Sequence, residues 1–488
     1  MSYASTQNVS TQKKPDVGQS QKSQKSQTRG PRSEFLSARE AAALLEVKLP
    51  TLYAYASRGL IQSVPASRGR SRRYRRRDLE RLCARRDARA GHGPVAAAAL
   101  RQGEPVLDSA ITLISLEKGP IYRGRAAVDL ARAGASFEFV AEGLWTGRWD
   151  DGDEGDDGGG DEDLSRSTAT ATATDWDWRP EGLGLDLEGI RRVLPPEVGP
   201  LSVLSIVVPL LAAQDPGRFG WHRDAVLPRA RILLRRAVAA LALGRAGRAV
   251  VVGEAVGEAV GEAVGETAAL ALAIRTSLEA PSLAAAIGGA FSKSLGEAEL
   301  AALNQALVLA ADHELNASTF AARVAASTGA DLYGCISAAL AALSGPRHGG
   351  AADRVEALLG EAGSAERVRT VVHERQRRGE VIEGFGHPIY APHPDPRGRL
   401  LIEIARDLPG GENENEAVAA VLALVETMQE AGLGGPSIDV GLVAFSRALD
   451  LPRGSATALF AIGRSVGWVA HALEQFEAGF LVRPRARY

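Results

Sequence analysis

Apolar residues recur at three- and four-residue spacing from Ala268 to the end of the chain, and Gly or Pro separates the repeats. This spacing places the apolar side chains on one face of an α-helix. It predicts helices of ordinary length at Glu297–Ala311, Ser318–Thr328, Gly334–Leu343, Ala365–Arg378, Glu416–Ala431, Gly454–Ala461 and Gly463–Glu477. Runs with a period of two are nearly absent. The main body is therefore predicted to be all-α, and too few strands remain for a doubly wound sheet.

A different pattern lies near the N-terminus. Ser37 and Glu40 have the spacing of a capping box at the start of the apolar segment Ala41–Val47. Leu49-Pro50-Thr51 opens a second helix, because proline is tolerated in a first turn, and Ser57-Arg58-Gly59 ends it. Two short helices joined by a tight turn predict a helix-turn-helix unit over residues 33–90. Residues 1–31, polar and with a Gln-Lys-Ser repeat, are predicted to be a disordered tail.

Charge is unevenly distributed along the chain. The 488 residues carry a net charge of −2, yet residues 33–90 contain 14 Lys and Arg against 6 Asp and Glu, a net charge of +8. Arginines dominate the end of this unit, and its candidate nucleic-acid contacts are Arg58, Arg68, Arg70, Arg72, Arg73 and Arg75. They would bind phosphates and give affinity more than sequence specificity. A basic docking or oligomerisation module, or one that binds an anionic metabolite or the chain's own acidic insert, fits the same pattern.

Two low-complexity segments interrupt the body. Residues 150–174 begin with nine acidic residues among fourteen positions, and residues 253–267 repeat Gly-Glu-Ala-Val. Like charges at this density repel, so the acidic insert is expected to be a solvated loop. It lacks the ligand spacing of a calcium loop. No function is assigned to the second insert.

Cysteine use and hydropathy exclude several classes of protein. Cys83 and Cys335 form no zinc or CxxC spacing, and no structural metal is expected. No run of about eighteen apolar residues suggests a membrane span. The N-terminal tail lacks the apolar region of a secretory signal. These features predict a soluble, cytoplasmic protein.

Candidate chemistry gathers in the C-terminal half. His313 lies in Asp-His-Glu-Leu-Asn-Ala-Ser-Thr, His348 in Gly-Pro-Arg-His-Gly-Gly, and His387 in Gly-Phe-Gly-His-Pro-Ile-Tyr. An isolated Asp439 follows in Pro-Ser-Ile-Asp-Val-Gly. Arginines complete the set, at Arg397, Arg464, Arg483 and Arg485.

These motifs, in this order, resemble the citrate synthase family. Ile121-Tyr-Arg-Gly-Arg125 and the following Ser-Phe-Glu-Phe-Val-Ala-Glu-Gly-Leu-Trp-Thr-Gly extend the resemblance, which spans about 104–149 and 268–488. The basic unit resembles the winged helix-turn-helix of MerR-like and excisionase-like proteins. The resemblance implies a two-lobed all-α fold, with a large domain at 104–343 and 439–488 and a small domain at 344–438. Substrate binding would close the small domain over the large one.

The same resemblance implies an acyltransferase that condenses acetyl-CoA with oxaloacetate. Asp439 would be the base, His348 would donate to the thioester oxygen, and His387 would protonate the ketone. Oxaloacetate would be bound by His313, Arg397 and Arg464, with Arg483 from a neighbouring subunit. No metal or cofactor is implied; acetyl-CoA is a substrate. A homodimer would be the minimum functional unit.

Several positions depart from the family pattern. Ala352 and Ser437 stand where asparagine is common, and Pro388 follows His387 where arginine is frequent. The loop from His387 to Asp395 is one residue longer than usual. These changes leave two alternatives open: a 2-methylcitrate synthase that uses propionyl-CoA, and a DNA-binding regulator that senses oxaloacetate or acyl-CoA.

Overall fold

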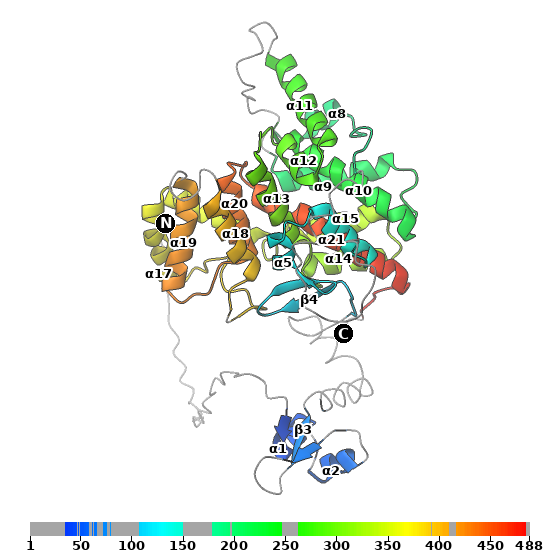
Figure 1. Ribbon diagram of the computed structural model, residues 1–488, viewed down its shortest axis with the longest axis vertical. Coiled ribbons are helices and arrows are strands. Elements are labelled where there is room, and N and C mark those ends of the chain that lie inside the picture. Colours follow the sequence, from blue (N-terminus) through cyan, green and yellow to red (C-terminus); the bar gives the residue numbers. More distant parts are fainter. Residues whose placement is uncertain are drawn as a thin grey trace, which may run out of the picture. The chain divides into compact units, whose positions relative to one another are not determined.

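The structure is a computed structural model, shown in Figure 1. It describes residues 35–45, 47, 49–57, 61, 63–65, 72–75, 79, 107–149, 178–195, 198–245, 262–391, 393–408 and 416–484. The predicted tail at 1–31, the acidic insert at 150–174, and Arg58, Arg68 and Arg70 lie outside these residues. The chain divides into two compact units, Met1–Val106 with Pro484–Tyr488, and Leu107–Arg483.

The first unit contains a small winged helical fold. Its elements are β1 (Phe35–Ser37), α1 (Ala38–Leu44), α2 (Leu49–Ser57), β2 (Ser63–Pro65) and β3 (Arg72–Arg75). The predicted capping box is confirmed: the Ser37 N–H donates to Glu40 at 2.8 Å, and the Glu40 N–H donates to the Ser37 hydroxyl at 3.3 Å. The strands form an antiparallel sheet of order β1-β3-β2.

Tyr74 anchors this sheet to the helices. It pairs with Leu36 across the sheet and is buried in a small core with Leu52 and Leu79. Because successive strand residues face opposite sides, Arg73 and Arg75 point away from that core. The arginine-rich segment is therefore the central strand, and the buried tyrosine fixes its position.

The second unit is mostly helical. It begins with β4 (Thr112–Ser115), β5 (Gly119–Tyr122), β6 (Arg125–Ala126), α5 (Ala127–Arg132), α6 (Phe137–Thr146) and α8 (Leu187–Val193). It continues with α9 (Pro200–Gln214), α10 (Arg223–Ala239), η1 (Ala240–Arg245), α11 (Glu262–Glu279), α12 (Leu283–Ala290), α13 (Glu297–Ala310), α14 (Ala317–Ser327) and α15 (Leu332–Leu343). It ends with α16 (Gly350–Ala362), α17 (Ala365–Arg377), α18 (Pro396–Asp407), α19 (Glu416–Glu430), α20 (Ile438–Ala448) and α21 (Ser455–Ala478).

Helix α21 lies at the centre of this unit (Figure 1) and packs against α13, α14, α15 and α20. Most of its residues are buried on every side, as expected for a helix without a solvent face. The sequence pattern predicted two helices here, divided at Gly463, and that prediction is wrong. A Cβ at Gly463 would lie 2.7 Å from the Ala310 Cβ. The glycine therefore serves close helix packing and does not end a helix.

A second group of helices, α17 to α20, gathers at one side of the unit (Figure 1). Helix α20 packs against α16, α18 and α19 as well as α21, and so joins this group to the central helix. The boundaries of the two predicted lobes stay a prediction.

Three short strands depart from a purely helical body. β4, β5 and β6 form an antiparallel sheet, with Thr112 opposite Tyr122. The buried Tyr122 hydroxyl donates to the Val308 carbonyl at 3.0 Å and accepts the Asp312 N–H at 3.2 Å. The strands are too short to show periodicity in the sequence, yet this contact fixes the turn between α13 and α14.

Candidate active site

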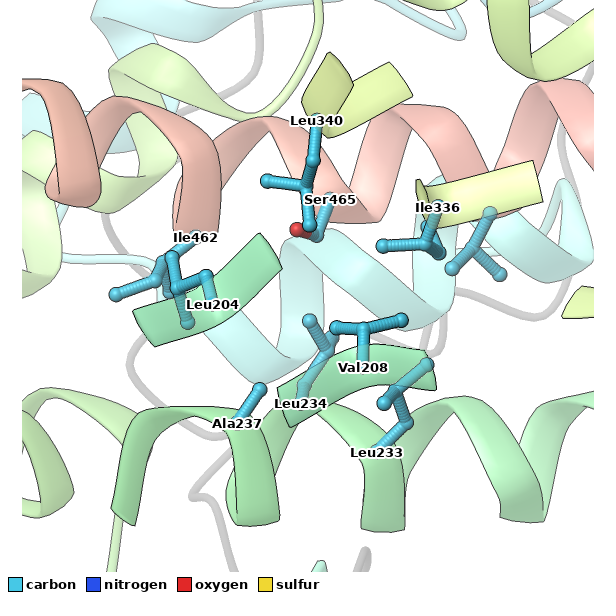
Figure 2. Close-up of a pocket in the computed structure, with 10 residues that line it drawn as sticks. Leu204, Val208, Leu233, Leu234, Ala237, Ile336, Leu340, Ile462 and Ser465 are labelled. Atoms are coloured by element: carbon cyan, nitrogen blue, oxygen red, sulfur yellow. The ribbon is translucent and has the colours of Figure 1, made fainter. Parts of the chain in front are cut away.

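An internal cavity lies between α9, α10, α15 and α21 (Figure 2). Its volume is about 20 Å³, and its lining is apolar except for Ser465, whose hydroxyl already donates to the Ala461 carbonyl. A bound water needs two to four polar partners, which this cavity does not supply. It is therefore a packing void, and none of the predicted site residues lines it.

Two of the predicted histidines meet at a tyrosine. His313 lies in the turn between α13 and α14, and His387 lies in the segment before α18; their ring centroids are 5.5 Å apart. The Tyr390 ring contacts both, and its hydroxyl is 2.7 Å from His313 Nε2. Burial raises the Tyr390 pKa to about 12, so the phenol stays protonated.

His313 is held in its neutral form. Burial, followed by the charges of Arg397 and Arg464, lowers its pKa well below the ordinary value. A neutral imidazole offers one N–H donor and one lone pair. The turn that carries His313 is fixed by Asp312, whose buried carboxylate lies 3.3 Å from His471 Nε2 and accepts the Glu314 N–H at 3.2 Å.

Arg397 and Asp395 form a buried two-point ion pair at the start of α18. Arg397 donates from Nε to Asp395 Oδ1 at 3.0 Å and from Nη2 to Oδ2 at 2.8 Å. Burial opposes the Arg397 charge, but the Asp395 carboxylate outweighs this effect and raises its pKa. Asp395 also caps α18 by accepting the Arg397 N–H at 3.1 Å. Arg397 Nη1 is buried without a hydrogen-bond partner among the described residues.

Arg464 is a second buried cation, on α21. Its Nε donates to the Ala310 carbonyl at 2.8 Å, and its guanidinium lies over the Phe460 ring. Burial lowers its pKa to about 10, so it stays charged at neutral pH. In the described part of the chain, its Nη2 also lacks a partner. The charges of Arg397 and Arg464 both lower the pKa of His313, so both guanidiniums lie near this histidine.

His348 precedes α16 and binds Ser318 of α14. Its Nε2 accepts the Ser318 N–H at 3.3 Å and lies 2.8 Å from the Ser318 hydroxyl. That hydroxyl also accepts the Trp468 indole N–H at 3.2 Å. Burial lowers the His348 pKa to about 4. Because Nε2 is an acceptor and the ring is neutral, the proton resides on Nδ1.

Asp439 lies in the first turn of α20 and is partly exposed. The Ser437 hydroxyl donates to its Oδ2 at 3.0 Å. Burial raises the Asp439 pKa, while the Ser437 hydrogen bond opposes that shift. The carboxylate is therefore a stronger base than a solvated aspartate.

The segments of Asp439 and His387 are paired by their backbones. Phe385 and Pro436 form a β-bridge, the Gly386 N–H donates to the Gly435 carbonyl at 3.1 Å, and the Ser437 N–H donates to the Gly384 carbonyl at 2.8 Å. A Cβ at Gly434 would lie 2.8 Å from the Gly386 Cα. Close approach therefore requires glycine there.

His387 is the remaining histidine of the group. Its Nδ1 accepts the Ile389 N–H at 3.3 Å, which leaves the proton of the neutral ring on Nε2. Burial, and then the Arg397 charge, lower its pKa.

The remaining predicted positions are Arg483 and the arginines of the first unit. Arg483 is exposed and makes no hydrogen bond or ion pair with a described residue of its own chain. Of the predicted phosphate contacts, Arg72 and Arg73 are exposed and Arg75 is half-buried. Within the described ranges, no cluster of His, Cys, Asp and Glu side chains could hold a metal ion. No described helix is long and apolar enough to cross a membrane.

Sequence reasoning missed three groups that shape the site. Tyr390 carried no signal beyond its position three residues after His387. Asp395 was visible in the Asp-Pro-Arg motif, where aspartate before proline is a common helix cap. Ser437 was noted only as a departure from asparagine, and its contact with Asp439 was not foreseen.

Comparisons with known proteins agree with this arrangement. A family model for the citrate synthase C-terminal domain matches residues 99–485, and a helix-turn-helix domain model matches residues 35–87. Citrate synthase 2 of Bacillus subtilis is 38% identical over 190 residues, which make up 39% of this chain and 51% of that protein. The citrate synthase of Haloferax volcanii is 38% identical over 187 residues, 38% of this chain and 49% of that protein. The chain thus spans about half the length of the curated relatives it matches.

Solved structures match over a longer range. The crystal structure of citrate synthase from Thermotoga maritima has a TM-score of 0.58 and 27% identity, and covers 79% of this chain and 94% of that one. The citrate synthase of Thermoplasma acidophilum, solved in a ternary complex with carboxymethyl coenzyme A and oxaloacetate, has a TM-score of 0.61 and 24% identity, and the match covers 80% of this chain and 95% of that one. At that identity the second match supports the fold alone.

Proposed function

This chain belongs to the citrate synthase family, and we propose that it condenses acetyl-CoA with oxaloacetate and water to give citrate and CoA. The observation that carries the proposal is the pair of buried guanidiniums. Arg397 Nη1 and Arg464 Nη2 lack partners in the described part of the chain. Unsatisfied buried donors are costly, so they favour an anion that accepts from both. Oxaloacetate, a small dianion, meets that requirement.

The protonation states of the site support the condensation step. Asp439 would remove a methyl proton from acetyl-CoA, and the His348 Nδ1–H would donate to the thioester oxygen as the enolate forms. The new C–C bond would join the methyl carbon to the ketone carbon of oxaloacetate. The ketone oxygen would take its proton from His387 Nε2. Both histidines have lowered pKa values, so each acts as a neutral donor.

Hydrolysis completes the proposed reaction. A water oxygen would bond to the thioester carbonyl carbon of citryl-CoA, the C–S bond would break, and CoA would leave as the thiol. His313 and Tyr390 would line the oxaloacetate side of the site. We propose a cytoplasmic location, as the sequence predicts, with the reaction as the first step of the tricarboxylic acid cycle.

CoA release tests this function. Purified full-length protein is assayed with oxaloacetate and either acetyl-CoA or propionyl-CoA. We expect turnover with a higher kcat/KM for acetyl-CoA. A higher value for propionyl-CoA would make the protein a 2-methylcitrate synthase. Oxaloacetate binding without turnover of either thioester would favour a sensor that regulates through its N-terminal unit.

Arg483 supports a homodimer in which each chain completes its partner's site. It is exposed and unpaired with any described residue of its own chain. Subunit mixing tests this assignment: Asp439→Ala and Arg483→Ala proteins, each inactive, should regain about a quarter of wild-type activity when their subunits are exchanged. Arg483 acting within its own subunit would restore none.

The N-terminal unit supports a second activity, binding to DNA. Arg72 and Arg73 are exposed on β3, whereas α2 contains no Arg, Lys, Asn or Gln to contact base edges. Phosphate contacts would then dominate, and affinity should fall steeply with salt. Replacing both arginines by alanine should weaken binding equally for unrelated duplexes. A loss confined to one sequence would indicate base recognition instead.

A further inference from the structure

The hydroxyl of Ser437 contacts the proposed base of the reaction from two sides. Its oxygen accepts the Asp439 N–H at 3.2 Å, and its proton is donated to Asp439 Oδ2 at 3.0 Å. Ser437 is buried, with 4% of its surface exposed. The hydroxyl thus accepts with one lone pair and donates its proton to the carboxylate.

We propose that Ser437 is a positioning residue that orients the Asp439 carboxylate and keeps it ionised for proton abstraction. The proposal rests on the function proposed above. With Oδ2 held by the hydroxyl, the methyl proton of acetyl-CoA goes to Oδ1. The serine itself does not touch the substrate.

Ser437 is held in place by the rest of the site. Its N–H donates to the Gly384 carbonyl at 2.8 Å, in the segment that leads to His387. The next residue, Ile438, donates its N–H to Asp395 Oδ2 at 3.2 Å. The Gly398 backbone packs so closely that a Cβ there would lie 2.3 Å from the Ser437 carbonyl oxygen. The hydroxyl is therefore fixed relative to both His387 and the Arg397 ion pair.

The contact has a defined effect on protonation. A hydrogen bond donated to a carboxylate stabilises its charged form, so the Ser437 hydroxyl opposes the upward pKa shift that burial causes at Asp439. Removing the hydroxyl should raise the pKa of the base. The acid limb of the pH–rate profile would then move to higher pH.

Three variants separate this role from helix capping. Ser437→Gly removes the hydroxyl but keeps a residue that is well tolerated at the N-cap. Ser437→Thr keeps the hydroxyl. Ser446→Ala is the matched control, because Ser446 is buried on the same helix and its hydroxyl has no partner among the described residues.

The pH dependence of kcat/KM for acetyl-CoA, with saturating oxaloacetate, is the main readout. In Ser437→Gly we expect kcat to fall at least about tenfold and the acid limb to move up by about one pH unit. The kinetic isotope effect with methyl-deuterated acetyl-CoA should increase. Ser437→Thr should have kcat and an acid limb close to those of the wild type, and Ser446→Ala should match the wild type. An unchanged acid limb and isotope effect in Ser437→Gly would overturn the proposal.

A second measurement needs no turnover. The denaturation midpoint at pH 7 should fall in Ser437→Gly, and the fall should be smaller in an Asp439→Ala background, because the hydroxyl–carboxylate contact is then already absent while the bond to the backbone N–H of residue 439 remains. Equal falls in both backgrounds would also overturn the proposal. A wild-type protein that releases no CoA would refute the proposed function. The comparison of Ser437→Gly in the wild-type and Asp439→Ala backgrounds would still test the Ser437 contact.

Discussion

Asp395 and Ile438 are joined by a 3.2 Å hydrogen bond from the Ile438 N–H to the Asp395 carboxylate. The same carboxylate binds the Arg397 guanidinium at two points. Ile438 directly precedes Asp439. One buried carboxylate thus connects the proposed oxaloacetate-binding arginine to the segment that carries the proposed base.

Replacing Asp395 should disturb both sides of this connection. Asp395→Ala leaves Arg397 buried without its counter-charge, and we expect a loss of about 3–5 kcal/mol in the free energy of unfolding. The KM for oxaloacetate should rise and kcat should fall. Urea denaturation and steady-state kinetics measure these effects. Glu403→Ala, on the same helix but in an exposed pair with Arg132, should change stability by less than about 1 kcal/mol.

Removal of the proposed base should separate chemistry from binding. Asp439→Ala is expected to lower kcat by about 10²–10⁴-fold, because the methyl proton then has no positioned acceptor. Calorimetric titration should show oxaloacetate affinity close to that of the wild type, since the arginines remain. Turnover near the wild-type rate would mean that the base is assigned wrongly.

The buried histidines should make the fold sensitive to acid. His348 has a pKa of about 4 in the folded protein and about 6.5 when unfolded. Between these values the unfolded chain binds a proton that the folded chain excludes. The contribution of His348 to the free energy of unfolding is therefore complete above pH 6.5 and is lost as the pH decreases toward 4. His348→Asn should reduce this slope in urea denaturation at several pH values. His373→Asn, at an exposed position on α17, is the control variant for the same measurement.

Two helical glycines should respond oppositely to alanine. In Gly463→Ala the new Cβ would lie 2.7 Å from the Ala310 Cβ and 3.0 Å from the Leu307 carbonyl oxygen, and we expect a loss of about 1–3 kcal/mol. Gly360 on α16 has no atom within 4 Å of a new Cβ. Gly360→Ala should stabilise the protein by about 0.5–1 kcal/mol through helix propensity. Thermal unfolding of the two variants compares them directly; destabilisation of equal size would contradict the packing explanation.

Deletion of residues 1–95 should leave condensation largely unchanged. The described site residues, Arg483 included, all lie between His313 and Arg483, within the second unit, Leu107–Arg483. CoA release by the truncated protein is the measurement, with circular dichroism and gel filtration as controls for folding and assembly. A large fall in kcat for a well-folded truncated protein would link the N-terminal unit to the active site.

The helical body was predictable because helix formation is read from short-range spacing. The predicted Glu297–Ala311 and Ala365–Arg378 each differ from α13 and α17 by one residue. The prediction for α15 began at Gly334, two residues late. Asp331 caps this helix by accepting the Gly334 N–H at 2.8 Å, so the helix begins at Leu332. A capping aspartate is a local signal and was available in the sequence.

The sequence by itself determined which residues are candidates for chemistry, since the motifs around His313, His348, His387 and Asp439 are each contiguous in the chain. Only the tertiary structure decided how they are held. The Tyr390–His313 contact, the Asp395–Ile438 hydrogen bond and the packing of α13 against Gly463 join residues distant in sequence. Spacing along one segment carries no information about such contacts, because they depend on how separate helices pack. The same packing buries the arginines and histidines, and burial is what sets their protonation states.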